Sequence, residues 1–283
     1  MSQAVLKLCC EDQRGIAFEV SRFIFENGGN VLDSQQHREE LDNQFFLYVK
    51  FDIEEMSCSR KQLLDGMTEL ASRYEMDWSL KFSDEKSRLA IMVSKYDHCL
   101  YDLMLRHKYG ELDAEISLIV SNHPDLENVA EHFGIPYICI PRSKDNREEA
   151  DKQALELFQK HNIDLIVMAR YMQILTPVLL DSYPNQIINV HHGFLPAFKG
   201  AKPYHQAYEK GVKLIGASSH YATAELDMGP LIEQETEKVS HSFSVQDLIR
   251  CGRDIESKVL ATAVKAHLDG KIIVYKNRTI VFD

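Results

Sequence analysis

The chain has 283 residues and a formal net charge of −11, with 45% hydrophobic and 27% charged residues. An acidic surface repels phosphate backbones, so no nucleic acid partner is expected. No segment reaches the roughly 20 apolar residues of a membrane span, and the N-terminal stretch lacks the apolar core of a signal peptide. Six cysteines without a C-x-x-C pair predict reduced thiols in a cytoplasmic protein that contacts no membrane.

The first 83 residues predict a β-α-β-β-α-β unit. Apolar residues recur at helical spacing in two stretches, and turn residues separate four short strand-like runs. The expected strands are residues 4–10, 30–39, 44–52 and 77–83, and the expected helices are residues 15–29 and 59–76.

After residue 88 the pattern changes to alternating strands and helices. The expected strands are short apolar runs at residues 88–94, 115–122, 137–141, 164–170 and 187–191, and the expected helices are 97–107, 125–133, 147–161 and 177–183. Apolar runs without alternation indicate strands covered on both faces, so a mostly parallel sheet wrapped by helices is predicted. Two longer strands, 213–222 and 230–239, and a long helix, 244–270, complete the pattern.

Two polar side chains end the last of the short strands. Asn189 and His191 are two residues apart, so both point to one face, at the strand end where open α/β sheets form their sites. An amide donor beside an imidazole suits an acyl carbon whose oxygen becomes negative in the transition state. A loop cap and a structural histidine remain the alternative for these two residues. Neither His205 nor His220 stands at a spacing that compels a metal site.

Asp227 is the next candidate, in the turn "ELDMGP" at residues 225–230. A carboxylate there could orient water, move a proton or hold a histidine ring. Aspartate before glycine is also common in ordinary turns, and Glu225 is a competing carboxylate that spacing does not exclude.

The segment "NVHHGFLPAFKGAKPYHQA", residues 189–207, with Asp227 36 residues after His191, resembles the folate-dependent formyltransferase family. That family carries an Asn-x-His pair, a loop with Leu-Pro and Gly-x-x-Pro, and a distal aspartate in a Leu-Asp-x-Gly-Pro turn. The likeness covers about residues 88–283 and implies a Rossmann-like, mostly parallel sheet. It also implies that the catalytic residues are Asn189, His191 and Asp227.

The resemblance further implies a folate site, so folate is the substrate and neither a cofactor nor a metal is expected. Residues 171–175, "YMQIL", match the segment whose backbone reads the pterin ring, and residues 222–226 match the loop that closes over it. Gln173 and Gly193 depart from residues common among relatives. The substrate-binding residues implied are Met172, Gln173, Ile174, Leu175, Ala222, Thr223 and Ala224.

The first 83 residues resemble an ACT domain, a ferredoxin-like fold, and "CEDQRGI" fits its first strand, turn and helix start. Together with the C-terminal "VYKNRTIVF", this makes the whole chain resemble the formyltetrahydrofolate deformylases. The resemblance implies hydrolysis of 10-formyltetrahydrofolate to formate and tetrahydrofolate, which supplies formate for purine synthesis and balances one-carbon folate pools. We expect an ACT-like regulatory domain at 1–83, a linker at 84–88 and a formyltransferase-type catalytic domain at 89–283.

The alternative is a glycinamide ribonucleotide formyltransferase, which must hold a phosphate. Relatives do so with a glycine-rich turn after the first catalytic-domain strand, where backbone amides approach the anion. Residues 92–104, "MVSKYDHCLYDLM", contain no glycine, and Asp97 would repel a phosphate. Water is therefore the expected acceptor, with Asn189 and His191 donating to the oxyanion and Asp227 accepting a proton from the water. The net charge argues against a methionyl-tRNA formyltransferase.

ACT domains bind small amino acids at subunit interfaces, so the resemblance implies control by glycine or methionine in a homodimer or homotetramer. The residues expected at that site are Asp12, Gly15, Gly28 and Asn30. Two alternatives remain open, namely a domain that only builds the oligomer and a wholly non-catalytic amino-acid sensor.

Overall fold

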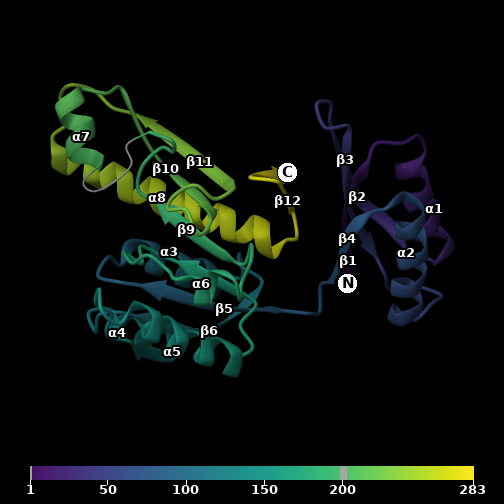
Figure 1. Cartoon of the computed structure of the whole chain (residues 1–283), viewed down its shortest axis with the longest axis horizontal. Coiled ribbons are helices and arrows are strands. Elements are labelled where there is room, and N and C mark those ends of the chain that lie inside the picture. The colour runs from purple at the N-terminus through teal and green to yellow at the C-terminus, as the bar shows by residue number, and fades with distance from the viewer. Residues whose placement is uncertain (1, 198–202) are drawn as a thin grey trace. The chain divides into compact units, whose positions relative to one another are not determined.

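The computed structural model describes residues 2–197 and 203–283, which form two compact units (Figure 1). The first unit runs to Lys86 and also contains Gly270–Tyr275 and Thr279–Asp283. The second unit contains Ser87–Asp269 and Lys276–Arg278. Gly200, the glycine of the expected Gly-x-x-Pro loop, lies outside the described residues.

The first unit is a four-stranded antiparallel sheet in the order β2-β3-β1-β4. Its elements are β1 (Gln3–Glu11), α1 (Ile16–Glu26), β2 (Asn30–Glu39), β3 (Gln44–Asp52), α2 (Arg60–Tyr74) and β4 (Asp77–Phe82). Alternate residues of β1, from Ala4 to Cys10, are buried against the apolar sides of both helices. Helix α2 begins at Ser59, which forms a capping box with Gln62.

The opposite face of this sheet is covered by C-terminal residues, among them β12 (Ile272–Tyr275) and most of β13 (Arg278–Val281). The Tyr48 and Phe282 rings stack with centroids 5.5 Å apart. Residues 270–275 and 279–283 thus pack with the N-terminal sheet, in contrast to the expected catalytic range of 89–283. These C-terminal residues pack there because β3 carries apolar side chains on both faces. The face that the two helices do not cover would otherwise be exposed to water.

The second unit is a seven-stranded sheet in the order β11-β10-β9-β8-β5-β6-β7. Its strands are β5 (Ser87–Val93), β6 (Ala114–Ser121), β7 (Tyr137–Cys139), β8 (Leu165–Met168), β9 (Ile187–His191), β10 (Leu214–Tyr221) and β11 (Leu231–Lys238). Its helices are α3 (His98–Lys108), α4 (Glu127–Phe133), α5 (Arg147–Lys160), α6 (Pro177–Leu180), α7 (Pro203–Lys210) and α8 (Val245–Leu268). The five strands from β9 to the edge strand β7 are parallel, and β10 is antiparallel to both of its neighbours, β9 and β11.

Helices cover both faces of this sheet (Figure 1), which explains the apolar runs of its central strands. After β5, the next two strands, β6 and β7, add to the sheet on one side of β5. The chain then crosses back, and β8 and β9 add on the other side. The topological switch point therefore lies between β5 and β8, where open sheets hold their ligands.

Strand β4 ends at Phe82 and strand β5 begins at Ser87, so residues 83–86 connect them. This connection is shorter than the expected linker of residues 84–88.

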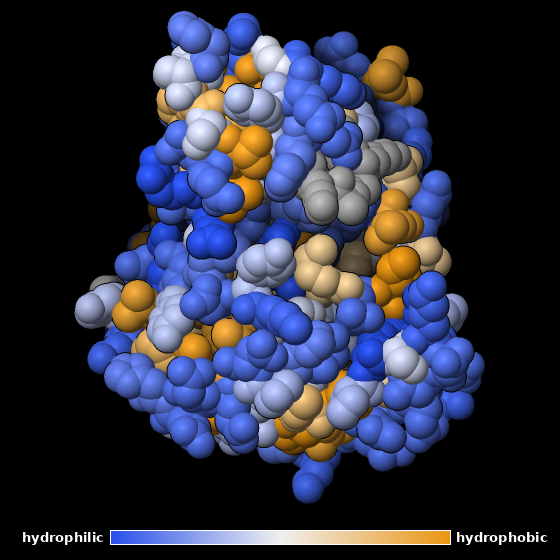
Figure 2. Space-filling model, turned by 90° about the vertical axis from the view of Figure 1, so that its left-hand side faces the viewer, coloured by the Kyte–Doolittle hydropathy of each residue, from blue (hydrophilic) through white to orange (hydrophobic). Residues whose placement is uncertain are grey.

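The expected fold class, a βαββαβ unit followed by a mostly parallel formyltransferase-type sheet, is confirmed. Among the described residues, no helix combines the length and apolar character that crossing a membrane would need. The face shown in Figure 2 is mainly hydrophilic, with apolar side chains in small separate groups, in keeping with the acidic composition.

Candidate active site

A cavity of about 280 Å³ lies in the second unit, around the carboxyl end of β9 and the segment that follows β8. It brings together every residue expected for catalysis or folate binding: Asn189, His191, Asp227, Met172, Gln173, Ile174, Leu175, Ala222, Thr223 and Ala224. Their convergence follows from the topology, because β8 and β9 are parallel neighbours and the turn after β10 folds back toward β9.

Asn189 and His191 project from β9 to the same side, as their spacing predicts, because Asn189 contacts His220 and both histidines lie beside Asp227. His191 Nδ1 lies 3.2 Å from Asp227 Oδ2. Asp227 has a left-handed backbone, with φ of 57°, which is uncommon for a residue other than glycine. The competing Glu225 is exposed and does not line the cavity, so the geometry distinguishes the two carboxylates where spacing did not.

His220 is a further member of the site, which the sequence suggested only as an unconvincing metal ligand. Its Nδ1 lies 2.9 Å from the Tyr221 carbonyl oxygen. A carbonyl can only accept, so Nδ1 donates and the other nitrogen, Nε2, accepts from Asn189 Nδ2 at 3.1 Å. His220 therefore orients the amide of Asn189. The two residues face each other across the antiparallel β9–β10 pair, a register that the sequence pattern did not reveal.

Asp227 is the charged centre of this group. The hydrogen bond from His191 comes first among the causes that hold the pKa of its carboxyl well below the usual range, the nearby His220 ring acts in the same direction, and burial opposes them. His191 Nδ1 is engaged by this carboxylate, while its Nε2 is buried and has no protein partner within residues 2–197 and 203–283. Nε2 is therefore the ring nitrogen left to act on a molecule in the cavity.

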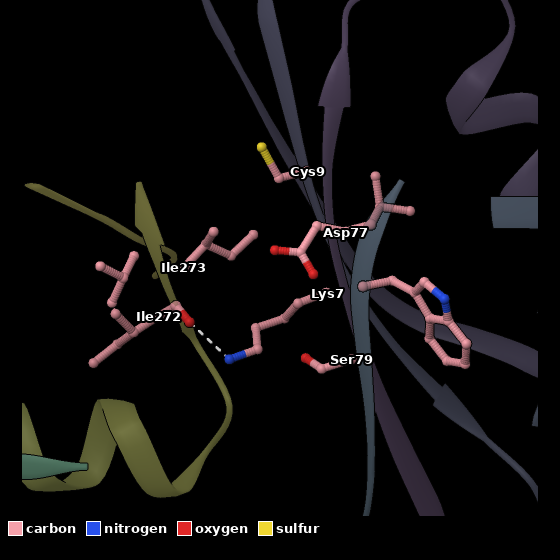
Figure 3. Close-up of a pocket in the computed structure, with 9 residues that line it drawn as sticks. Lys7, Cys9, Asp77, Ser79, Ile272 and Ile273 are labelled. Atoms are coloured by element: carbon pink, nitrogen blue, oxygen red, sulfur yellow. Dashed lines mark hydrogen bonds between the residues drawn. The ribbon is translucent and has the colours of Figure 1, made fainter. Parts of the chain in front are cut away.

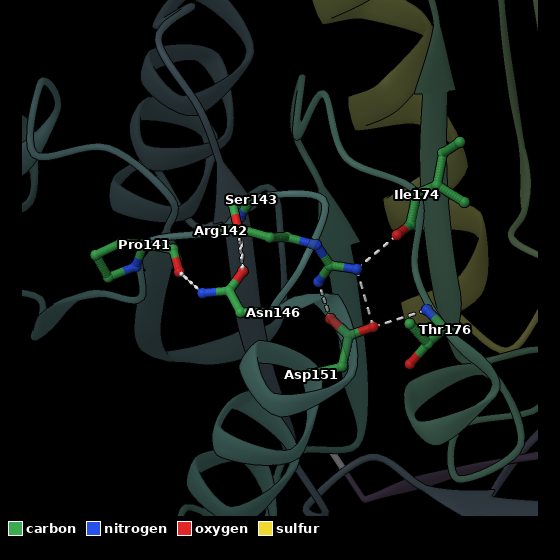
Figure 4. A network of polar contacts seen from close by, with 7 residues as sticks. All are labelled: Pro141, Arg142, Ser143, Asn146, Asp151, Ile174 and Thr176. Atoms are coloured by element: carbon green, nitrogen blue, oxygen red, sulfur yellow. Dashed lines mark hydrogen bonds and ion pairs between the residues drawn. The ribbon is translucent and has the colours of Figure 1, made fainter.

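A network of buried charges holds the wall of the cavity formed by residues 172–175 (Figure 4). Arg142 and Asp151 pair through both guanidinium Nη atoms, and their side chains are 1% and 0% exposed. Arg142 Nη2 donates to the Ile174 carbonyl at 2.6 Å, and Thr176 N donates to Asp151 Oδ2 at 2.7 Å. The sequence did not single out this pair, which lies outside the recognised motifs.

A third anchor for the same segment is Ser94, which directly follows β5. Met172 N donates to Ser94 Oγ at 3.1 Å, and Ser94 Oγ donates to Asn122 Oδ1 at 2.6 Å. The segment is thus fixed at Met172, Ile174 and Thr176 by groups behind it. In the part of the chain that the structure describes, the peptide N–H of Leu175 makes no hydrogen bond and is free to bind a ligand.

Residues 87–264 match the formyl transferase family. The formyltetrahydrofolate deformylase of Synechocystis sp. is 48% identical over 279 residues, covering 99% of this chain and 98% of its own. The crystal structure of a formyltetrahydrofolate deformylase from Pseudomonas syringae pv. tomato superposes with a TM-score of 0.97 at 41% identity, covering 100% of this chain and 95% of that one. The chain belongs to the formyltetrahydrofolate deformylase family.

The predicted family and enzyme class, a hydrolase, are confirmed by these matches. A glycinamide ribonucleotide transformylase from Symbiobacterium toebii is a more distant relative, with a TM-score of 0.66 and 27% identity. It covers 72% of this chain but 98% of itself. The deformylases match the full chain, whereas the transformylase leaves more than a quarter of it unmatched.

The four residues expected to bind an amino acid in this deformylase family member divide into two pairs. Asp12 and Gly15 lie where β1 leads into α1, and Gly15 caps the helix with φ of 92°. Gly28 and Asn30 follow the other end of α1, which at 11 residues spans about 16 Å. Asp12 is engaged by Arg38 at 2.6 Å. Within one chain the two pairs therefore do not form a single site.

Proposed function

We propose that this chain hydrolyses 10-formyltetrahydrofolate to formate and tetrahydrofolate, so that it releases formate for purine synthesis and adjusts one-carbon folate pools. The observation that carries the proposal is the convergence of Asn189, His191 and Asp227 on one cavity that residues 172–175 also line. Full-length similarity to proteins named formyltetrahydrofolate deformylase supports the substrate.

The pterin ring is held between residues 172–175 and 222–224, both of which line the cavity. The pterin ring carries an amide group, so it needs peptide donors and acceptors whose positions are fixed. The segment that contains Ile174 is anchored by hydrogen bonds, so it supplies them without reorganising when the ring binds. The formyl group then lies against the end of β9, beside Asn189 and His191. Apolar lining residues such as Leu175 exclude bulk water and strengthen these polar contacts.

Hydrolysis begins when a water oxygen attacks the formyl carbon. Asn189 donates one amide hydrogen to His220 and keeps the second for the developing oxyanion, and His191 donates to the same oxygen through Nε2. The Asp227 carboxylate takes the proton released by the water. The bond from carbon to N10 then breaks, the proton passes to N10, and formate and tetrahydrofolate leave.

The test uses purified full-length protein and 10-formyltetrahydrofolate, with tetrahydrofolate and formate both measured, in the presence and absence of glycinamide ribonucleotide. We expect equal amounts of the two products, at a rate that the nucleotide does not change. Turnover that requires the nucleotide would instead identify a transferase. Binding of amino acids without any turnover would identify a sensor.

We further propose that glycine or methionine controls this activity through the first unit, in a homodimer or homotetramer. The two residue pairs at opposite ends of α1 can meet in one site only if a second copy contributes one of them. Calorimetric titration with each amino acid, together with light scattering, tests the proposal. Binding that Asp12→Ala abolishes in an oligomer supports it, and a monomer that binds neither amino acid contradicts it.

A further inference from the structure

The crevice at the topological switch point is filled by the chain's own side chains. Ala169 N donates to the Met92 carbonyl at 2.9 Å, which joins the carboxyl ends of β8 and β5. Open α/β sheets usually hold a ligand outside this crevice. Here the residues that follow the two strands, Arg170 and His98, converge instead on Glu256 of α8.

Glu256 is the centre of this group, which we call the Glu256 cluster: Glu256, His98, Tyr204, Arg170 and Tyr96. His98 Nε2 lies 2.8 Å from Glu256 Oε2, the Tyr204 hydroxyl donates to Oε1 at 2.6 Å, and Arg170 Nε lies 3.3 Å from Oε2. Tyr96 covers the Arg170 guanidinium, with its ring centroid 4.9 Å away. The Glu256 side chain is 1% exposed, so the cluster seals the crevice.

The position of Tyr204 against α8 depends on a glycine. A Cβ built at Gly252 would come within 2.1 Å of the Tyr204 ring and hydroxyl. Only glycine at this point of α8 lets Tyr204 reach Glu256 one turn further along the helix. The close approach shows that the seal is built into the packing of α7 on α8.

The chemistry of the cluster does not suit a ligand of its own. Although His98, Cys99 and Glu256 offer ligand atoms within 4.8 Å of one another, Arg170 occupies the carboxylate that a metal ion would need. Burial raises the pKa of the Cys99 thiol, which disfavours the thiolate that binds metals. Burial also acts to raise the pKa of Glu256, but the hydrogen bond from His98 and the nearby positive charge of Arg170 outweigh it and keep the carboxylate ionised and paired.

The cluster borders the proposed reaction site. Arg170 itself lines the cavity that contains Asn189 and His191. The pKa of His192, next to His191 in the chain, falls to about 4 because of burial and the nearby Arg170 charge, and Glu256 acts on it in the opposite direction. Any organic acceptor that approached the formyl carbon from the switch-point crevice would have to displace these side chains.

We propose that the Glu256 cluster determines acceptor specificity by closing the crevice beside His191 to amines and leaving water as the acceptor. The inference rests on the proposed deformylase function and explains why this chain would hydrolyse a formyl group that relatives named transformylases pass on. With the crevice open, an amine R–NH2 would attack the formyl carbon, the bond from that carbon to N10 would break, and N10 would take the proton lost by the amine. The products would be R–NH–CHO and tetrahydrofolate.

The experiment opens the crevice and offers a small amine. His98→Ala and Tyr96→Ala remove two covers of the cluster, while His98→Gln keeps the volume and a donor for Glu256. Each protein is given 10-formyltetrahydrofolate and excess glycinamide, and tetrahydrofolate, formate and N-formylglycinamide are measured by mass spectrometry. Tyr96 is 45% exposed, so its variant keeps the test valid if loss of His98 unfolds the chain.

We expect wild type and His98→Gln to release formate in step with tetrahydrofolate. Either opened variant should form at least about ten-fold more N-formylglycinamide per tetrahydrofolate, the scale at which pocket contacts discriminate substrates. Equal yields from wild type and a folded opened variant would overturn the proposal. Loss of tetrahydrofolate release by folded opened variants would also overturn it, by placing the cluster in the hydrolytic machinery. Wild-type release without glycinamide tests the deformylase function separately.

Discussion

His191 Nδ1 and Asp227 Oδ2 lie 3.2 Å apart, although 36 residues separate them in the chain. The hydrogen bond from His191 is the main reason that the pKa of Asp227 lies well below the usual range. In the proposed mechanism Asp227 accepts the proton from water, while His191 donates through Nδ1 to Asp227 and through Nε2 to the oxyanion. Asp227 therefore both orients the imidazole ring of His191 and interacts with it electrostatically.

Replacing Asp227 should therefore be the most damaging change in the site. We expect Asp227→Asn to lower kcat by about 10³–10⁴-fold, because the shape is kept while the charge and the proton acceptor are lost. Steady-state release of tetrahydrofolate measures the effect. Glu225→Gln is the matched control and should behave as wild type. Near-normal turnover by Asp227→Asn together with an inactive Glu225→Gln would move the base to Glu225.

Asn189 is expected to supply one strong oxyanion donor. Loss of such a donor costs about 10²–10³-fold in kcat, so Asn189→Ala should fall in that range with little change in KM. His220→Gln, which disturbs only the orientation of the amide, should lose less activity than Asn189→Ala. If Asn189→Ala loses less than about five-fold, Asn189 is not an oxyanion donor.

The Arg142–Asp151 pair should act on binding rather than on chemistry. Asp151→Asn leaves a buried guanidinium uncompensated, which typically costs about 3–5 kcal/mol, and it loosens the segment that carries Ile174. We expect the KM for 10-formyltetrahydrofolate to rise about ten-fold or more with kcat largely kept. Glu149→Gln, on the exposed side of the same helix, is the control. A destabilised Asp151→Asn protein with an unchanged KM would show that the segment does not depend on the pair.

Lys7 lines a cavity of about 230 Å³ between β1, β4 and β12, where its Nζ donates to the Ile272 carbonyl at 2.7 Å (Figure 3). Burial and then the nearby Lys81 charge lower the pKa of Lys7 to about 8. An unfolded lysine titrates near 10.4, so between about pH 8 and 10.4 the unfolded state binds the extra proton and the stability of the folded state rises with pH.

Lys7→Met removes this dependence. Relative to wild type, its melting temperature should be most favourable at pH 7. Most of that advantage should be lost by about pH 10, because Lys7 is then neutral in the folded state and the unfolded lysine is beginning to lose its proton. Thermal melts of both proteins at each pH measure the difference. Lys61→Met, on an exposed position of α2, controls for loss of one positive charge. A difference that stays constant from pH 7 to 10 would contradict the prediction.

The sequence by itself determined the elements and the faces of the strands. Hydrophobic periodicity is a local property, so it located the βαββαβ unit, the apolar strands and the shared side of Asn189 and His191. The motif around these residues and Asp227 also identified the segments that line the cavity. The first unit's C-terminal cover was not visible in this way, because its short strands carry no sign of which sheet they will meet.

Only the tertiary structure decided which side chains support the site. His220 reaches Asn189 through the register of an antiparallel pair, and Arg142 reaches Ile174 across 32 residues of chain. Glu256 meets His98 although 158 residues separate them. Such contacts depend on strand order and helix packing, which place distant residues together without leaving a periodic pattern. The candidate reacting groups could thus be recognised from a local motif, whereas their orientation and charge, and the closing of the crevice beside them, depend on the fold.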